Sequence, residues 1–317
     1  MFKGEETTVP GEPGNLCWRR LSFSGFPGLN FGKVPDPLLL EFLQKYEYRN
    51  LQAAACLAPL LARDSPSPEK APVPRFSGGR EKFWVCFFGD RVAGLLAVKG
   101  GLALPLFAPE FDPWLDRALA ALPFRENYRT LLGMKNAVEG MEKLCPGPRL
   151  DFHYLLLVHP GWGEAPPLPR KDPGEFLIRR AGIEDLEALL PLQRAYELEE
   201  VVSDPARFDP LLCRRHFQNQ LKGEYILGLW EGGVPLAKGG TNAQGLGFCQ
   251  VGGVYTVPRR RNQGLSKALI RRLLWEMDRR NRRLCLFVKT ANRSALGVYE
   301  KTGFQPAGDF KISYSRS

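Results

Sequence analysis

The sequence predicts an α+β fold of two domains, each with a mixed, mostly antiparallel sheet flanked by helices. Three observations support this prediction. The chain has 317 residues, more than one hydrophobic core usually holds. Residues 161–174 form a Pro-rich polar stretch, which cannot hold a helix or a central strand. On both sides of it, short apolar runs alternate with segments of helical period. The predicted division is therefore a domain at 1–160, a linker at 161–174 and a domain at 175–317.

The first domain is predicted to open with a helix over residues 38–58. Leu39, Phe42, Leu43 and Tyr46 have the spacing of one buried helical face, and Pro59 is expected to end the helix. Strands are expected at 83–88, 92–98, 102–107, 130–133 and 152–158, and helices at 114–122 and 137–144.

The second domain is predicted to begin with a strand at 176–180. A helix over 183–198 follows, with Leu186, Leu189 and Leu190 on one face. Further helices are expected at 210–221, from 265 onward and at 294–302, and strands at 225–230, 235–241, 248–257, 284–288, near 304 and at 311–314. This order of elements predicts a mixed sheet.

One segment of the second domain has the pattern of a phosphate site. The strand at 248–257 ends at Pro258, which cannot donate to a ladder, and a helical period begins at Leu265. The turn between them carries Arg259, Arg260 and Arg261, followed by Gly264. The free N–H groups and the positive dipole end of a helix start favour a bound phosphate. This pattern therefore predicts a pyrophosphate site.

This segment resembles the acetyl-CoA signature of the GNAT superfamily of N-acetyltransferases. Arg261, Gly264 and Ser266 stand at the motif positions, with Ser266 in place of the usual Gly or Ala. A second signature of that family follows, made of the strand at 284–288, Asn292 and the segment 298–304. The resemblance implies that the second domain is a catalytic GNAT acetyltransferase that uses acetyl-CoA. It assigns cofactor binding to Val254, Tyr255, Thr256, Arg261, Asn262, Gln263, Gly264, Leu265, Ser266 and Asn292.

The resemblance also implies the catalytic groups. A backbone N–H between Val254 and Thr256 is expected to face the acetyl oxygen, as an oxyanion donor does. Tyr299 matches the family tyrosine that protonates the departing thiolate. Asn292 matches a residue that contacts the cofactor arm, although an Asn before a helix is also a common N-cap.

The general base is not evident from the sequence. Many relatives carry a Glu on the strand before the cofactor loop, and Gln250 stands near that place. A glutamine cannot accept a proton, so this strand does not supply the base. Glu197, in the last turn of the predicted helix at 183–198, and Glu199 and Glu200, just after it, could bind an ammonium or relay its proton through water. We therefore name Glu199, Glu200 and Gln250 as candidate substrate-binding residues; acidic residues at a helix end are equally often only solvated.

The first domain shows a weaker similarity to the same family, in element order and not in motif. After the strand at 102–107, where a cofactor loop would follow, residues 108–113 are acidic and lack the Arg-x-x-Gly pattern. Acidic groups would repel a pyrophosphate. The first domain is therefore expected to be a degenerate GNAT-like domain that packs, shapes the substrate cleft or dimerises.

Composition limits the remaining function classes. No apolar run approaches the ~20 residues of a membrane span, and residues 1–30 lack a signal core, so we expect a cytoplasmic protein. The seven cysteines include no Cys-x-x-Cys pair, and no metal site is expected. A net charge of +10 suits nucleic acid, but a nucleotide cofactor is the simpler ligand, and no nucleic-acid partner is expected. The sequence leaves open whether the chain forms a homodimer.

Three alternatives to the acetyltransferase stay open. A tandem GNAT-like aminoacyl transferase that uses charged tRNA would share the two-domain plan, but such proteins typically lose the intact pyrophosphate loop. A non-catalytic acyl-CoA sensor would keep the loop and have no need of the Tyr299 phenol. A nucleic-acid-binding protein would use the basic face. The expected acceptor is a small-molecule or peptide amine whose identity the sequence does not give.

Overall fold

The chain forms two compact units in a computed structural model that describes residues 7–8, 16–20, 37–61, 82–122, 128–145, 147, 149–161, 176–202 and 204–315. The first unit contains the described residues up to Leu156 together with those from Ala307 onward, and the second contains residues 157–306. The predicted linker at 161–174 lies outside the described residues except for Gly161. The mixed α+β architecture, with sheets flanked by helices, is confirmed.

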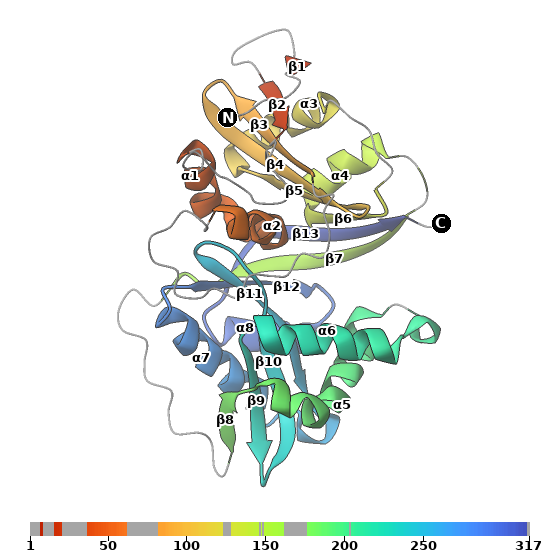
Figure 1. Cartoon of the computed structure of the whole chain (residues 1–317), viewed down its shortest axis with the longest axis vertical. Coiled ribbons are helices and arrows are strands. Elements are labelled where there is room, and N and C mark those ends of the chain that lie inside the picture. Colours follow the sequence, from red (N-terminus) through yellow and green to blue (C-terminus); the bar gives the residue numbers. More distant parts are fainter. Residues whose placement is uncertain are drawn as a thin grey trace, which may run out of the picture. The chain divides into compact units, whose positions relative to one another are not determined.

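The sheet of the first unit has the strand order β1-β2-β3-β4-β5-β6-β13-β7 (Figure 1). Its β5 and β6 pair in parallel, whereas β2 to β5 and the pair β6 and β13 are antiparallel. The strands are β1 (Thr7–Thr8), β2 (Leu16–Arg20), β3 (Lys82–Phe88), β4 (Arg91–Lys99), β5 (Leu102–Phe107), β6 (Thr130–Met134), β7 (Arg149–Val158) and β13 (Gln305–Ser315). Continuous apolar runs such as that of β4 bury both faces of this sheet.

Helices cover this sheet, and one of them differs from its prediction. The segment expected as one helix at 38–58 is α1 (Pro37–Tyr46), a 3-10 turn η1 (Glu47–Asn50) and α2 (Leu51–Leu61). The break lies at Asn50, whose side chain donates to the carbonyls of Pro105 and Leu132. Pro59 does not end α2, which continues to Leu61. The other helices are η3 (Pro109–Trp114), α3 (Leu115–Ala120) and α4 (Lys135–Leu144), of which α3 and α4 share a core with β2 to β5.

The acidic segment at 108–113 forms η3 in the structure. Its carboxylates are engaged within the first unit. Glu110 accepts a hydrogen bond from the Tyr46 hydroxyl, and Asp112 lies 3.5 Å from Arg49. This part of the first unit is therefore occupied by internal contacts.

The last strand of the chain differs from its prediction. The residues expected to close the second domain form β13, which pairs antiparallel with β6 of the first unit from Phe310 to Tyr314. Lys311 anchors β13 there, since its buried ammonium lies 2.8 Å from both Glu142 and Asp151. The second unit thus ends before the predicted limit at 317, because strand pairing is decided by long-range contacts and not by local pattern.

The second unit has the strand order β12-β11-β10-β9-β8, in which β11 and β12 are parallel and the others antiparallel. Its strands are β8 (Leu177–Arg180), β9 (Ile226–Glu231), β10 (Val234–Gln244), β11 (Phe248–Thr256) and β12 (Arg283–Lys289). Its helices are η4 (Ile183–Asp185), α5 (Leu186–Tyr196), η5 (Glu197–Val201), η6 (Pro205–Arg207), α6 (Pro210–Gly223), η7 (Pro258–Arg260), α7 (Leu265–Asp278) and α8 (Arg293–Glu300).

Two helical layers hold this second sheet. Helices α5 and α6 share a core with β9, formed around Leu189 and Phe217. Helix α7 packs along β9 to β12 with the apolar face predicted from its period, which includes Ile270, Leu273 and Met277. The predicted helix at 183–198 instead ends as α5 at Tyr196 and continues as a π-helical turn, η5. Such turns are frequent at functional sites. None of the described helices is long and apolar enough to span a membrane.

Candidate functional site

The turn between β11 and α7 has the geometry of an anion-binding loop. After β11, the 3-10 turn η7 and the residues Arg261–Gly264 lead into α7 at Leu265. Asn262 and Gly264 have positive φ values of 62° and 80°. Gly264 tolerates this conformation because it has no Cβ, and nothing lies within 4 Å of the Cβ position. Gly264 is therefore required by its backbone conformation and not by lack of space, because the region around its Cβ position is open.

The start of α7 offers backbone donors to this open space. Ala268 donates to the Gly264 carbonyl at 3.0 Å, which closes the first helical turn, and no side chain caps the helix at Gly264. The amides before Ala268 have no partner inside a helix, as at any helix start. The hydroxyls of Ser266 and Thr256 lie 2.8 Å apart and join the strand end to the first turn. The arrangement suits a bound phosphate.

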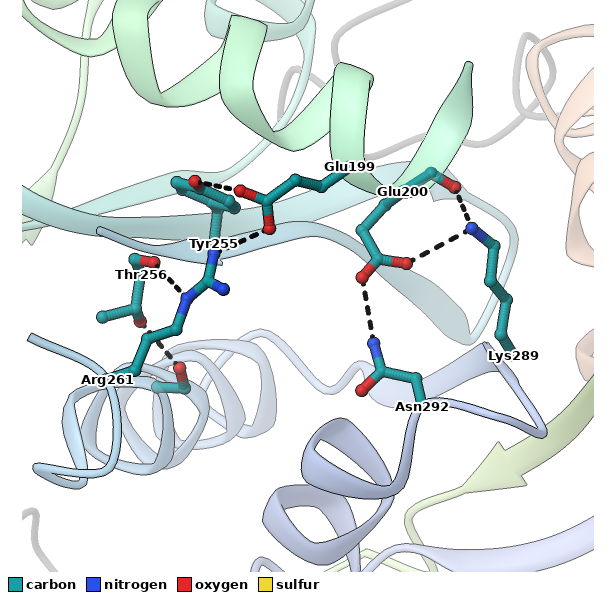
Figure 2. Close-up of polar contacts among 8 residues, drawn as sticks. Glu199, Glu200, Tyr255, Thr256, Arg261, Lys289 and Asn292 are labelled. Atoms are coloured by element: carbon teal, nitrogen blue, oxygen red, sulfur yellow. Dashed lines mark hydrogen bonds and ion pairs between the residues drawn. The ribbon is translucent and has the colours of Figure 1, made fainter. Parts of the chain in front are cut away.

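Arg261 is held at the edge of this loop. Its Nε donates to the Thr256 carbonyl at 3.1 Å, and its terminal nitrogen lies 2.7 Å from the Glu199 carboxylate (Figure 2). The Tyr255 hydroxyl donates to the other Glu199 oxygen at 2.7 Å. These hydrogen bonds, from Tyr255 and then Arg261, lower the pKa of Glu199. Glu199 is therefore ionised at neutral pH and shares Arg261 with any anion in the loop.

Glu200 makes a second set of contacts on the α8 side of the site (Figure 2). One carboxylate oxygen accepts from the Asn292 amide at 3.0 Å, and the other lies 3.4 Å from Lys289. Asn292 also accepts from the Ala295 amide at 3.0 Å, which caps α8 as its sequence position suggested. Glu199 and Glu200, both from η5, thus connect this turn to the loop and to α8.

These residues line a pocket of about 240 Å³ in the second unit. All but two of the predicted site residues lie in its wall. The lining is Glu199, Glu200, Val254, Tyr255, Thr256, Arg260, Arg261, Asn262, Gly264, Leu265, Ser266, Lys267, Asn292, Ser294, Ala295, Val298 and Tyr299. Gln263 is not in the wall, and Gln250 is only 3% exposed on β11 and lies outside it. Lys267, Ser294 and Ala295 were not predicted, and Arg260 and Val298 were named only as parts of the basic turn and of the second signature.

A bulge in β11 separates this pocket from the strand behind it. Lys238 pairs with Tyr255 and Gly240 with Gly252, so Gly239 alone faces Gly253 and Val254. Gly253 has a φ of 63°, which glycine adopts without strain. A bulge takes backbone groups out of the ladder, and Val254 lines the pocket. Val254, Tyr255 and Thr256, among which the oxyanion donor was expected, all line this pocket.

Tyr299 lies in the wall of the same pocket. It is on α8, 8% exposed, and its ring packs against Phe304 at 5.7 Å between centroids. Burial, together with the nearby Tyr196 and Glu200, raises the pKa of Tyr299 above its ordinary value of 10.0. The phenol therefore keeps its proton at neutral pH, as a proton donor requires.

Lys238 supports the bulge from behind and was not predicted. It is 2% exposed, and its Nζ donates to the Gly253 carbonyl at 2.8 Å. The rings of Tyr196 and Phe217 lie 5.0 and 5.3 Å from it. Burial lowers the pKa of Lys238 from 10.5 to about 7. Its sequence setting, a lysine in a strand, gives no sign of this role.

This buried lysine predicts a pH dependence of stability. Below pH 7 the folded and unfolded states both hold the proton. Between about pH 7 and 10.5 the unfolded chain holds it and the folded chain does not, so the free energy of unfolding rises with pH. From pH 7 to pH 9 the rise is about 2 kcal/mol by this linkage. Urea unfolding at both pH values should show it in the wild type and not in Lys238→Met; an equal rise in both would contradict the assignment.

Residues 188–304 match the acetyltransferase (GNAT) family model. This segment lies wholly in the second unit and contains β11, the loop, α7 and α8. The match identifies residues 188–304 as similar to a GNAT acetyltransferase domain. The first unit contributes no residue to this match, so its resemblance to the same family stays a prediction.

Solved structures resemble the chain at low sequence identity. A Drosophila protein aligns with a TM-score of 0.60 at 14% identity, over 94% of this chain and 98% of its own. A GNAT-family acetyltransferase from Colwellia psychrerythraea aligns with a TM-score of 0.47 at 14% identity, over 88% of this chain and 97% of its own. A predicted acetyltransferase with acetyl-CoA from Clostridium acetobutylicum aligns with a TM-score of 0.36 at 21% identity, over 42% of this chain and 91% of its own. The Drosophila structure supports the fold alone. Comparison with curated proteins finds no match.

Proposed function

We propose that the second unit transfers an acetyl group from acetyl-CoA to a primary amine by direct attack in a ternary complex. The observation that carries this proposal is one pocket whose wall holds both the loop at 258–266 and the Tyr299 phenol. The loop suits a pyrophosphate, and the phenol suits a leaving thiolate. The family match over residues 188–304 supports the reaction class.

The residues present fit the cofactor. The first-turn amides of α7 and the guanidinium of Arg261 face the same pocket, and Arg260 and Lys267 add positive charge to its wall. Backbone amides at a helix start and arginine side chains are the usual partners of phosphate oxygens. Bound acetyl-CoA would supply an acetyl group activated as a thioester. We assign its pyrophosphate to Gly264, Leu265 and Ser266 with Arg261.

The chain supplies the groups that the transfer needs. We assign to the Val254 amide, at the bulge, the stabilisation of the oxygen that gains negative charge as the amine attacks. Tyr299 holds the proton that the departing sulfur requires. Gln250 cannot accept a proton and lies outside this pocket, and the β11 residues in the pocket wall include no carboxylate or imidazole, so we do not assign the base to β11.

A thiol-release assay tests the proposed function. The protein is incubated with acetyl-CoA and a panel of amines, and free thiol is measured over time. Release that depends on an amine, with formation of the matching acetamide, is the expected result. Tight coenzyme A binding without turnover of any amine would contradict the proposal and favour a non-catalytic acyl-CoA sensor.

The contact between Glu199 and Arg261 predicts an effect on cofactor affinity. Glu199 shares Arg261 with the proposed pyrophosphate, and its own negative charge repels it. Glu199→Gln should therefore lower the Kd for coenzyme A by about two- to fivefold, the size of a half-exposed ion pair. Isothermal titration calorimetry measures this change. Glu187→Gln, which removes an exposed carboxylate paired with Arg214, is the matched control and should leave the Kd unchanged. A weaker Kd for Glu199→Gln would show that Glu199 helps to bind the cofactor.

A further inference from the structure

A second pocket, of about 400 Å³, lies on the other side of the β11 bulge. It is formed by α5, η5, α6, β10 and β11, all within the second unit. Its lining is Gln193, Tyr196, Glu197, Val201, His216, Asn219, Gln220, Asn242 and Gly253. Gly253 belongs to this pocket and its neighbour Val254 belongs to the first. The two pockets therefore meet at the bulge, where the reacting groups of the proposed transfer would meet.

The wall of this second pocket is polar and has no fixed cation. Glu197 is its one carboxylate, and four of the other side chains are amides. Within the described part of the chain, no Lys or Arg lines it, although the protein carries a net charge of +10. The nearby Lys238 is outside the wall, bonded to the Gly253 carbonyl. A carboxylate or phosphate would find no Lys or Arg in this wall and, of the side chains that can become cations, only His216, whereas an ammonium would find Glu197.

Two amide oxygens of this wall also lack donors. Oε1 of Gln193 and Oδ1 of Asn242 are buried and have no hydrogen-bond partner among the residues the structure describes. Gln193 itself is 3% exposed, and its Nε2 donates to Glu197 at 2.8 Å, which fixes the side chain beside the carboxylate. A buried acceptor without a donor costs about 1 to 3 kcal/mol. A ligand that brings N–H or O–H groups would remove this cost.

We infer that the second pocket binds the acceptor, a small polyamine or amino alcohol without a carboxylate or phosphate, with an ammonium held by Glu197 and further donors facing Gln193 and Asn242. This inference rests on the proposed function, because it names the substrate class of the same reaction. Its evidence is separate, since it comes from residues that do not line the cofactor pocket.

The transfer balances as follows. An ammonium that enters the site loses one proton through Glu197 to water, and the neutral nitrogen forms a bond to the acetyl carbon. The carbon–sulfur bond breaks, and the sulfur takes the proton of Tyr299. After the attack the nitrogen gives up one of its two remaining protons to the Tyr299 phenolate, which restores the phenol. The products are an acetamide, a thiol and one released proton.

A matched pair of amines tests the substrate class. Ornithine differs from 1,4-diaminobutane by its carboxylate, so the two compare the same amine with and without an anionic group. At saturating acetyl-CoA, the diamine should have a kcat/KM at least tenfold above that of ornithine. Glu197→Gln should raise the KM for the diamine about tenfold or more and leave the Kd for coenzyme A within twofold. Glu187→Gln, on α5 and exposed, is the control for loss of one negative charge.

Equilibrium binding separates this inference from the proposed function. Calorimetry with 1,4-diaminobutane and coenzyme A needs no turnover. Diamine binding that Glu197→Gln abolishes, without any acetylation, would uphold the pocket and overturn the transferase. Equal binding or turnover of ornithine and the diamine, absence of diamine binding, or a Glu197→Gln variant that affects only coenzyme A would overturn the inference.

Discussion

Replacing Tyr299 by phenylalanine is expected to lower kcat about 100-fold or more while the Kd for coenzyme A changes less than twofold. The phenol lies in the wall of the cofactor pocket, and its raised pKa keeps it protonated throughout the neutral range. General acid catalysis contributes typically ~10²- to 10⁴-fold, and phenylalanine keeps the ring contact with Phe304. Steady-state kinetics and calorimetry on the same preparation measure the two effects.

Tyr225→Phe is the matched control for this substitution. Tyr225 lies in the second unit, outside both pockets, so that loss of its phenol should leave kcat near the wild-type value. A Tyr299→Phe variant with wild-type kcat would contradict the role as proton donor. A variant with unchanged kcat and a weaker Kd would instead mean that the phenol only orients the cofactor.

Arg261→Ala is the change with the largest expected effect on cofactor binding. We expect the Kd for coenzyme A to rise about 30-fold, since a charge-assisted hydrogen bond between arginine and phosphate is worth about 1.5 to 3 kcal/mol. Loss of Arg261 also leaves the Glu199 carboxylate without its cation, next to the proposed pyrophosphate. Calorimetric titration measures the Kd.

A double variant makes the Arg261 experiment more specific. Arg261→Ala combined with Glu199→Gln should recover part of the affinity, because the uncompensated carboxylate is removed. Arg271→Ala, an exposed position on α7 away from the pocket wall, controls for loss of general positive charge and should have little effect. If Arg271→Ala weakened coenzyme A binding as much as Arg261→Ala, the effect would be one of overall charge and not of the loop.

The residues of the loop and its flanking elements could be picked out from the sequence because they are close together in the chain. A strand, a proline, three arginines, a glycine and a helical period lie within residues 248–277, and each has a local physical cause. The same applies to Asn292, whose position before a helical segment suggested the N-cap that the structure shows. Of the residues assigned to cofactor binding, only Gln263 is outside the pocket wall.

The rest of the site was not predictable from local pattern. The bulge at Gly253 depends on its register with β10, and the second pocket combines Gln193, Glu197 and Asn242 from three separate elements. Lys238 has the same sequence setting as any lysine in a strand, and only its burial in the folded chain distinguishes it. The sequence of strand β13 would fit the last strand of either unit; its pairing with β6, and the contacts of Lys311 with Glu142 and Asp151, show which sheet it joins.

The most direct test of the account is a crystal structure with coenzyme A bound. We expect pyrophosphate oxygens within about 3 Å of the amides of Gly264, Leu265 and Ser266. We also expect Arg261 to contact the pyrophosphate. Coenzyme A bound with its pyrophosphate away from this loop, or with Arg261 still paired only to Glu199, would contradict it.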